Sequence, residues 1–207
     1  MSTRDRMLDA AAYVMRTHGL ARATTKQIAK EAGYSEAALY KHFRDKTDLF
    51  LAVLSERTPN TLATLLAQLG QRVGQATVRA TLEDIARAAI TFYRHNFPMA
   101  ASLFAEPRLL AAHRQALRER GAGPARVSDA VAGYLAAEQD LGRVQPGTDP
   151  QAAAALLLGA CLQHAFLGHF ADRHDDEDSD RRFAASLVDT LATGLLPPQT
   201  ADRTPPE

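Results

Sequence analysis

Residues 24–48 read TTKQIAKEAGYSEAALYKHFRDKTD and carry the strongest local signals in the chain. Thr24 and Gln27 have the spacing of a capping box, in which two side chains satisfy the free backbone amides at the start of a helix. The spacing predicts a helix over about 25–32. Gly33 follows and can adopt the positive φ that ends a helix.

Two further helix starts lie just downstream. Ser35 can cap a second helix over about 35–42, and Asp45 can cap a longer third one that begins at Lys46. Two short helices joined by a turn that contains glycine are typical of a helix-turn-helix motif.

The residue types in this segment suit a contact with double-stranded DNA. The outer side of the second helix carries Glu36, Ala37, Tyr40 and Lys41, and small side chains at a helix N-terminus allow close approach to base edges. All four lysines of the chain lie within residues 26–46, in an otherwise neutral protein. Spacing alone leaves another interpretation open, because glycine turns between short helices are common in all-α proteins.

Sequence motifs then add a family resemblance. The run LYKHFRDK at 39–46, preceded by TTxxIAxxAG at 24–33, resembles the TetR family of bacterial transcriptional regulators, and LDAA at 8–11 followed by Gly19 resembles that family's first helix. The resemblance implies an all-α dimer whose two three-helix heads enter successive major grooves of a palindromic operator. It also implies a larger helical body in which a bound small molecule releases the DNA.

The resemblance assigns roles position by position. It places Thr25 and Lys26 near phosphate and the groove edge, and it places three residues from Glu36 onward against the bases. The candidate DNA-binding residues are Thr25, Lys26, Ser35, Glu36, Ala37, Ala38, Tyr40, Lys41, His42 and Lys46.

Glu36 departs from the family's common pattern, because a basic or neutral polar residue often stands there. Its carboxylate repels phosphate, but it can accept a hydrogen bond from cytosine N4. Alternatively, Glu36 favours the N-terminus of its own helix by its negative charge. The sequence leaves both interpretations open.

The rest of the chain also reads as helix, because Ala and Leu are frequent and apolar residues recur at helical spacing. We expect an all-α fold of about nine to ten helices. One apolar stripe should end at Pro98, with a short separate piece over 98–105. The domains predicted are a helix-turn-helix head (1–46), a ligand-binding and dimerisation body (47–196) and a disordered tail (197–207). The helix that begins at Lys46 should link head and body.

The body should supply the dimer interface and the ligand pocket. The last two helices carry small and apolar residues that could form a four-helix interface with a second copy, or could simply pack within one subunit. The interface candidates are Ala155, Gly159, Gln163, Phe166, Phe183, Leu187 and Leu191. Aromatic residues of the middle helices could line a cavity for an apolar or aromatic ligand, or could be ordinary core. The pocket candidates are Phe92, Tyr93, Phe104, Tyr134 and Phe166.

Several classes of protein are disfavoured. Cys161 is the only cysteine, which excludes an internal disulfide. We find no phosphate-binding glycine loop, GxSxG elbow or HExxH motif, so no catalytic residues are expected. Neither a cofactor nor a metal is expected, since the acidic stretch over 172–180 lacks the calcium-loop pattern and reads as a solvated loop. We also expect no charge-free apolar run of about 18 residues, which argues against a membrane span. With one cysteine and an amphipathic N-terminal pattern in place of a signal peptide, a cytoplasmic, reduced setting is expected.

The function expected is therefore that of a ligand-responsive, sequence-specific DNA-binding regulator. We expect a repressor, with an activator as the alternative that the sequence leaves open. Its partners would be palindromic operator DNA, a second copy of itself and a small molecule. The alternative is a helical carrier or enzyme with an incidental helix-turn-helix.

Overall fold

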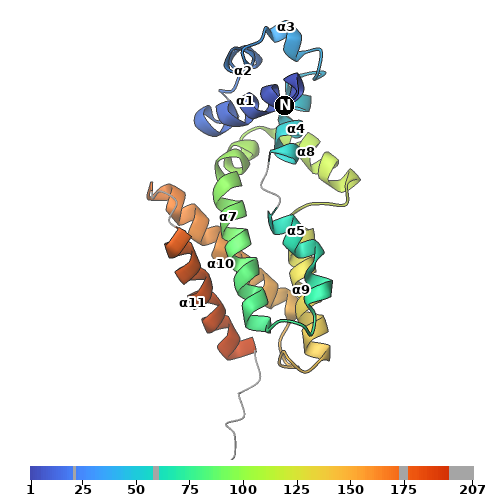
Figure 1. Cartoon of the computed structure of the whole chain (residues 1–207), viewed down its shortest axis with the longest axis vertical. Coiled ribbons are helices and arrows are strands. Elements are labelled where there is room, and N and C mark those ends of the chain that lie inside the picture. The colour runs from blue at the N-terminus through green and yellow to red at the C-terminus, as the bar shows by residue number, and fades with distance from the viewer. Residues whose placement is uncertain (21, 58–60, 173–176, 196–207) are drawn as a thin grey trace, which may run out of the picture. The chain divides into compact units, whose positions relative to one another are not determined.

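The computed structural model describes residues 1–20, 22–57, 61–172 and 177–195, and this part of the chain is helical with no strand (Figure 1). The expected all-α class is confirmed. The helices are α1 (Thr3–His18), α2 (Thr25–Ala32), α3 (Glu36–Leu39), α4 (Lys46–Glu56), α5 (Thr61–Ala67), α6 (Leu69–Arg72), α7 (Val78–Phe104), α8 (Pro107–Glu119), α9 (Pro124–Asp140), α10 (Pro150–Phe170) and α11 (Glu177–Leu195).

The chain divides into two compact units. Unit 1 comprises residues 1–60 and 92–123, and unit 2 comprises 61–91 and 124–207. Helix α7 begins in unit 2 and ends in unit 1, whereas α4 lies wholly in unit 1. The helix shared by the two units is thus α7 and not the helix that begins at Lys46, which ends at Glu56.

Unit 1 is held by one apolar core that reaches beyond the predicted head. Apolar faces of α1, α2 and α4 meet in it, and Met99, Leu103 and Leu109 from α7 and α8 complete it. Met7, Leu8 and Met15 of α1 and Ile28 of α2 are fully buried, as the 3.6-residue period of these helices predicts. The last part of α7 and α8 therefore fold with the head.

Three local expectations need correction. The apolar stripe does not end at Pro98, because α7 continues through this proline to Phe104. Proline lacks the amide that would bond the carbonyl of residue 94. The helix continues beyond it into the core of unit 1, where Met99 and Leu103 are buried. The second short helix is only four residues long, and 40–42 continue as turns.

The third correction concerns the acidic stretch, since Glu177 and the residues after it belong to α11 and not to a loop. The described residues do not include 173–176 or the tail from 197. They also exclude Pro59, where the sequence predicts a kink or an interruption of the helix that begins at Lys46.

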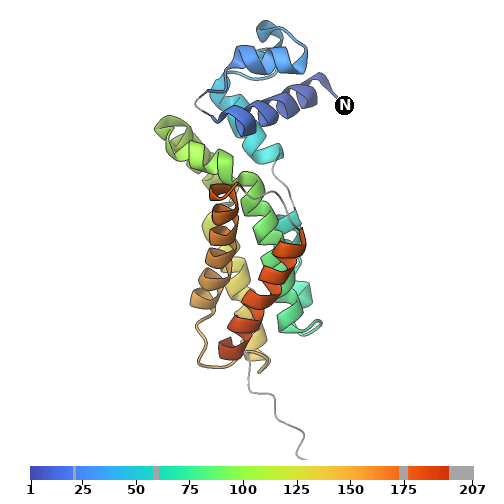
Figure 2. The same ribbon diagram turned by 90° about the vertical axis from the view of Figure 1, so that its left-hand side faces the viewer.

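Unit 2 packs α9, α10 and α11 with α5, α6 and the first part of α7. Helices α10 and α11 run side by side in both views (Figures 1 and 2). Asp149 caps α10, because its side chain accepts from the amides of Gln151 and Ala152. Glu138 is fully buried: its Oε1 accepts from Gly74 N (3.1 Å) and its Oε2 pairs with Arg143 Nε (3.2 Å), so α9 is joined to the segment before α7.

Helix α10 contradicts one expectation. It holds no Asp, Glu, Lys or Arg over Pro150–Phe170 and is long and apolar enough, by length and composition, to cross a membrane. One face of α10 is buried within unit 2, and core helices of soluble proteins pass the same test. The other face exposes Leu156, Leu162, Leu167 and Phe170. Side-chain hydrophobicity alone therefore does not identify α10 as a membrane span.

Candidate nucleic-acid interface

The caps that start and stop the helix-turn-helix are those expected from its sequence. Thr24 and Gln27 form a complete capping box at α2, and Gly33 ends α2 in the left-handed region with φ 77°. Ser35 Oγ accepts from Ala38 N, and Asp45 accepts from Asp48 N. Local sequence thus sets where α2, α3 and α4 begin, through three hydrogen-bonded caps.

Two apolar side chains anchor α3 to the head. Leu39 and Phe43 are buried in the core of unit 1, and Tyr34 in the turn packs against the same core. Arg6 of α1 donates to Tyr34 Oη (3.1 Å). Because α3 is so short, these anchors rather than intrahelical hydrogen bonds hold it in place.

The candidate DNA-binding residues lie on the surface with one exception. Tyr40 is 47% exposed, so this ring is not a core residue. Glu36 and Ala38 are half-buried, and Thr25 is buried. The other exposed candidates are Lys26, Ser35, Ala37, Lys41, His42 and Lys46.

Thr25, Glu36 and Tyr40 form a hydrogen-bonded relay between α2 and α3. The Thr25 hydroxyl donates to Glu36 Oε1 (2.5 Å), and the Tyr40 hydroxyl donates to Thr25 Oγ1 (3.3 Å). Neither interpretation of Glu36 from sequence foresaw this contact. Glu36 and Tyr40 lie 11 and 15 positions after Thr25 in the sequence. Helical periodicity predicts contacts between residues three or four positions apart, so it does not indicate these two contacts.

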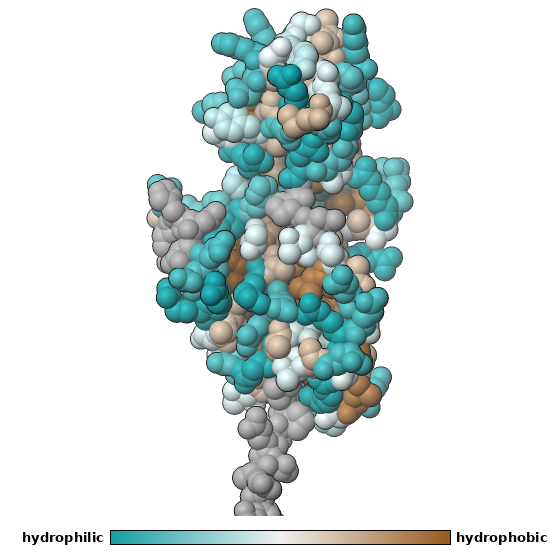
Figure 3. Space-filling model, viewed as in Figure 1, coloured by the Kyte–Doolittle hydropathy of each residue, from teal (hydrophilic) through white to brown (hydrophobic). Residues whose placement is uncertain are grey.

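The surface of these first helices is mainly hydrophilic in the view of Figure 3, as an interface with phosphate requires. Lys46 stands at the first position of α4, with Nζ 5.0 Å from the centroid of the Phe50 ring. The exposed Arg44 reaches Asp48, through its backbone amide (3.0 Å) and its guanidinium (3.5 Å).

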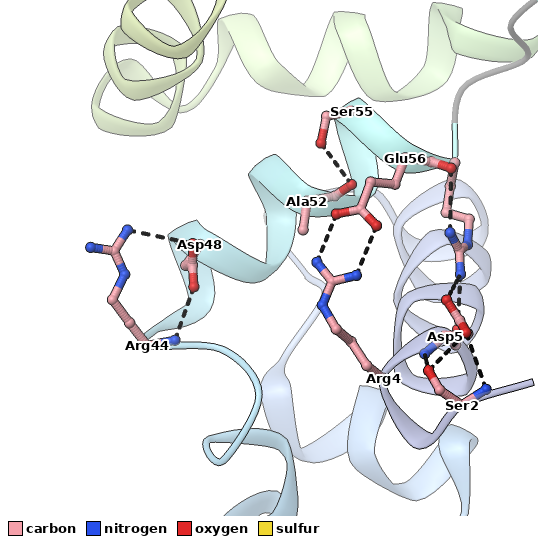
Figure 4. A network of polar contacts seen from close by, with 9 residues as sticks. Ser2, Arg4, Asp5, Arg44, Asp48, Ala52, Ser55 and Glu56 are labelled. Atoms are coloured by element: carbon pink, nitrogen blue, oxygen red, sulfur yellow. Dashed lines mark hydrogen bonds and ion pairs between the residues drawn. The ribbon is translucent and has the colours of Figure 1, made fainter.

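Two arginines, Arg4 and Arg57, form ion pairs that join α1 to the end of α4 (Figure 4). Arg4 bonds both carboxylate oxygens of Glu56, and Arg57 pairs with Asp5 (3.2 Å) and Asp9 (2.6 Å). Hydrogen bonds from the side chain and backbone of Ser2, together with Arg57, lower the pKa of Asp5 to about 2. Sequence reasoning missed these residues, since their partners lie about 50 positions away.

The predicted pocket residues are divided between the two units. Phe92, Tyr93 and Phe104 belong to unit 1, where Phe104 is 70% exposed. Tyr134 and Phe166 belong to unit 2. Tyr134 is buried, which raises its pKa to about 12, and Phe166 is exposed. Phe92 and Tyr93 make an edge-to-face contact (5.6 Å between ring centroids), and the assignment of the five residues to a pocket stays a prediction.

The predicted interface residues occupy two neighbouring helices of unit 2. Four of them are exposed on α10 and three are half-buried on α11. Phe183 stacks on His164 of α10 (4.0 Å between ring centroids), and His164 Nε2 lies 3.0 Å from Asp180 Oδ1. The α11 residues therefore also pack within the chain, while α10 presents an apolar face without cover from unit 2. The exposed members are Ala155, Gly159, Gln163 and Phe166, and the half-buried members are Phe183, Leu187 and Leu191.

Comparison with known proteins agrees with this architecture. Residues 7–53 match the family described as bacterial regulatory proteins, tetR family. The HTH-type transcriptional regulator SrpR of Pseudomonas putida is 37% identical over 84 residues, which cover 40% of this chain and 39% of SrpR. The chain thus spans about two fifths of the length of this curated relative.

Solved structures share the fold over nearly the whole chain. A structure from Mesorhizobium loti described as a TetR-family transcriptional regulator has a TM-score of 0.73 at 21% identity and covers 94% of this chain and 97% of its own. The complex of SmeT with triclosan has a TM-score of 0.67 at 24% identity and covers 100% of both chains. The described residues thus share the all-helical fold of these structures, with a helix-turn-helix near the N-terminus. Residues 7–53 are thus similar to the N-terminal domain of tetR-family regulatory proteins.

Proposed function

We propose that the chain is a sequence-specific, DNA-binding transcriptional regulator that acts as a homodimer in the cytoplasm and performs no enzymatic reaction. The observation that carries this proposal is the exposed α3 segment, anchored from behind by Leu39 and Phe43, with Tyr40, Lys41 and Lys46 on its accessible side. An outward helix with small residues at its start and cations at its end suits the major groove of DNA.

Selection of double-stranded DNA from a random library tests this function. The wild type is expected to enrich a palindromic sequence and to bind it below micromolar concentration at physiological salt. A helical carrier would enrich no sequence, and that outcome would refute the proposal. Binding to DNA from upstream of the chain's own coding sequence is a second expected result.

The homodimer is proposed on the apolar face of α10. Leu156 is 62% exposed and lies on the same face as Gly159 and Phe166, and such a face is suited to a symmetric contact with a second copy. In sedimentation equilibrium, the wild type should have twice the mass of the chain and Leu156→Glu should sediment as a monomer. Ala111→Glu on the exposed side of α8 is the matched control and should remain dimeric. A monomeric wild type would contradict the proposed dimer.

We further propose repression that is relieved by an apolar or aromatic small molecule. SmeT has been solved with triclosan, a chlorinated aromatic compound, and the shared fold supports this ligand class. A ligand that prefers the DNA-free conformation lowers the affinity of the protein for DNA. By linkage, bound DNA lowers the affinity of the protein for the ligand by the same factor. Calorimetric titration with apolar aromatic compounds, with and without the selected duplex, measures both factors. Equal affinities in the two titrations would contradict this part of the proposal.

A further inference from the structure

We propose that Glu36 is a positioning residue that fixes α3 for DNA recognition through Thr25, and that it does not read a base. This inference rests on the proposed DNA-binding function and assigns a role within its site. It follows from the relay in which the Tyr40 hydroxyl donates to Thr25 and the Thr25 hydroxyl donates to the Glu36 carboxylate.

The hydrogen count of the relay limits what Thr25 can do. A threonine or tyrosine hydroxyl carries one hydrogen, and an ionised carboxylate carries none. The hydrogen of Thr25 is given to Glu36, and that of Tyr40 is given to Thr25. Thr25 is also buried, at 9% exposure, whereas phosphate oxygens approach from the surface. The Thr25 hydroxyl therefore links the two helices and has no hydrogen left to donate to phosphate.

The shortness of α3 explains why such a link matters. Its four residues contribute a single buried side chain, Leu39, and a helix of this length is unstable alone. Leu39 and Phe43 fix the inner side of the segment, whereas Glu36 fixes its first turn to the first turn of α2. The same link orients the Tyr40 phenol, which belongs to the surface that would meet DNA.

Binding to the selected duplex and to a scrambled duplex tests the proposal. Thr25→Val and Glu36→Ala should each weaken specific binding about tenfold, as expected for the loss of a hydrogen bond to a charged group, with little change on the scrambled duplex. The double variant should bind no more weakly than either single variant, since both changes break the same link. Thr25→Ser and Glu36→Gln keep a donor and an acceptor and should stay within about threefold of the wild type.

Selected sequences distinguish this role from base reading. All four single variants should enrich the wild-type sequence. If Glu36→Ala enriches a different base at one position while Thr25→Val does not, Glu36 reads DNA directly and the proposal is wrong. Additive losses in the double variant would also overturn the proposal, because they indicate an independent phosphate contact by Thr25. A gain in affinity for Glu36→Ala would overturn it as well, because it indicates simple charge repulsion between Glu36 and the DNA.

A measurement without DNA separates this inference from the proposed function. Hydrogen exchange of the Leu39 and Tyr40 amides in the free protein should speed up about tenfold in Thr25→Val and Glu36→Ala but not in Thr25→Ser. Unchanged exchange in all three variants would overturn the positioning role. A wild type that selects no DNA sequence would instead refute the proposed function. The exchange rates would then still test whether the Thr25–Glu36 hydrogen bond holds α3 in place.

Discussion

Arg4 donates one hydrogen bond to each carboxylate oxygen of Glu56, at 2.8 and 2.7 Å, and so joins the first turn of α1 to the last turn of α4 (Figure 4). Within unit 1, the contact therefore holds the end of α4 to the start of α1. It also raises the pKa of Arg4 and lowers that of Glu56, through the hydrogen bonds between them.

A double-mutant cycle measures the strength of this ion pair. Both side chains are about 40% exposed, so the pair should contribute about 0.2–1 kcal/mol, towards the upper end because it is bidentate. Urea unfolding of Arg4→Ala, Glu56→Ala and the double variant gives the coupling free energy. Strictly additive losses would show that the pair does not stabilise the head.

Acid should destabilise the head through Asp5. Its pKa is lowered to about 2 in the folded chain by Ser2 and by Arg57, against about 4 in an unfolded chain. A lowered folded pKa gives stability that is fully present above pH 4 and is lost as the pH falls towards 2. The free energy of unfolding of the wild type should therefore fall more steeply over this range than that of Asp5→Asn. Parallel pH profiles would contradict the assignment.

Removal of the Lys46 charge should weaken binding to all DNA sequences alike. The exposed ammonium at the start of α4 is placed to contact phosphate, and each such contact contributes about one unit to the slope of log K against log salt. Lys46→Ala should lower the slope by about one unit and leave the selected sequence unchanged. The exposed Arg181 of α11 offers a matched control, since Arg181→Ala should not alter the slope. An unchanged slope in Lys46→Ala would remove this residue from the interface.

Cys161 should report on the integrity of unit 2. The thiol is buried in α10, and burial raises its pKa to about 12, so almost none is thiolate at pH 8. Reaction with a disulfide reagent should be very slow in the folded chain and fast in strong denaturant, with one thiol per chain. Equal rates under both conditions would show that α10 does not pack as described.

The helix-turn-helix was predictable because its signals are local. Thr24, Ser35 and Asp45 cap the helices that follow them within three residues, and Gly33 supplies a backbone conformation that other residues rarely adopt. Buried positions in α1 also follow from periodicity alone. None of these inferences required knowledge of tertiary contacts.

The errors arose where distant residues decide the outcome. Pro98 is a helix breaker by local rules, but α7 passes through it, and Met99 just beyond it is held in the core. The Thr25–Glu36 hydrogen bond depends on the crossing of α2 and α3, which periodicity does not encode. The ion pairs of Arg4 and Arg57 join residues about 50 positions apart in the sequence, so no local pattern predicts them.

Protection of guanine N7 in the selected duplex tests the central claim most directly, because this atom lies in the major groove. We predict two protected clusters, about 10 base pairs apart on one face of the duplex, in line with two heads in successive major grooves. Tyr40→Ala combined with Lys41→Ala should abolish both clusters together. A single cluster, no protection of N7 despite tight binding, or protection that survives this double substitution would contradict the entry of α3 into the groove.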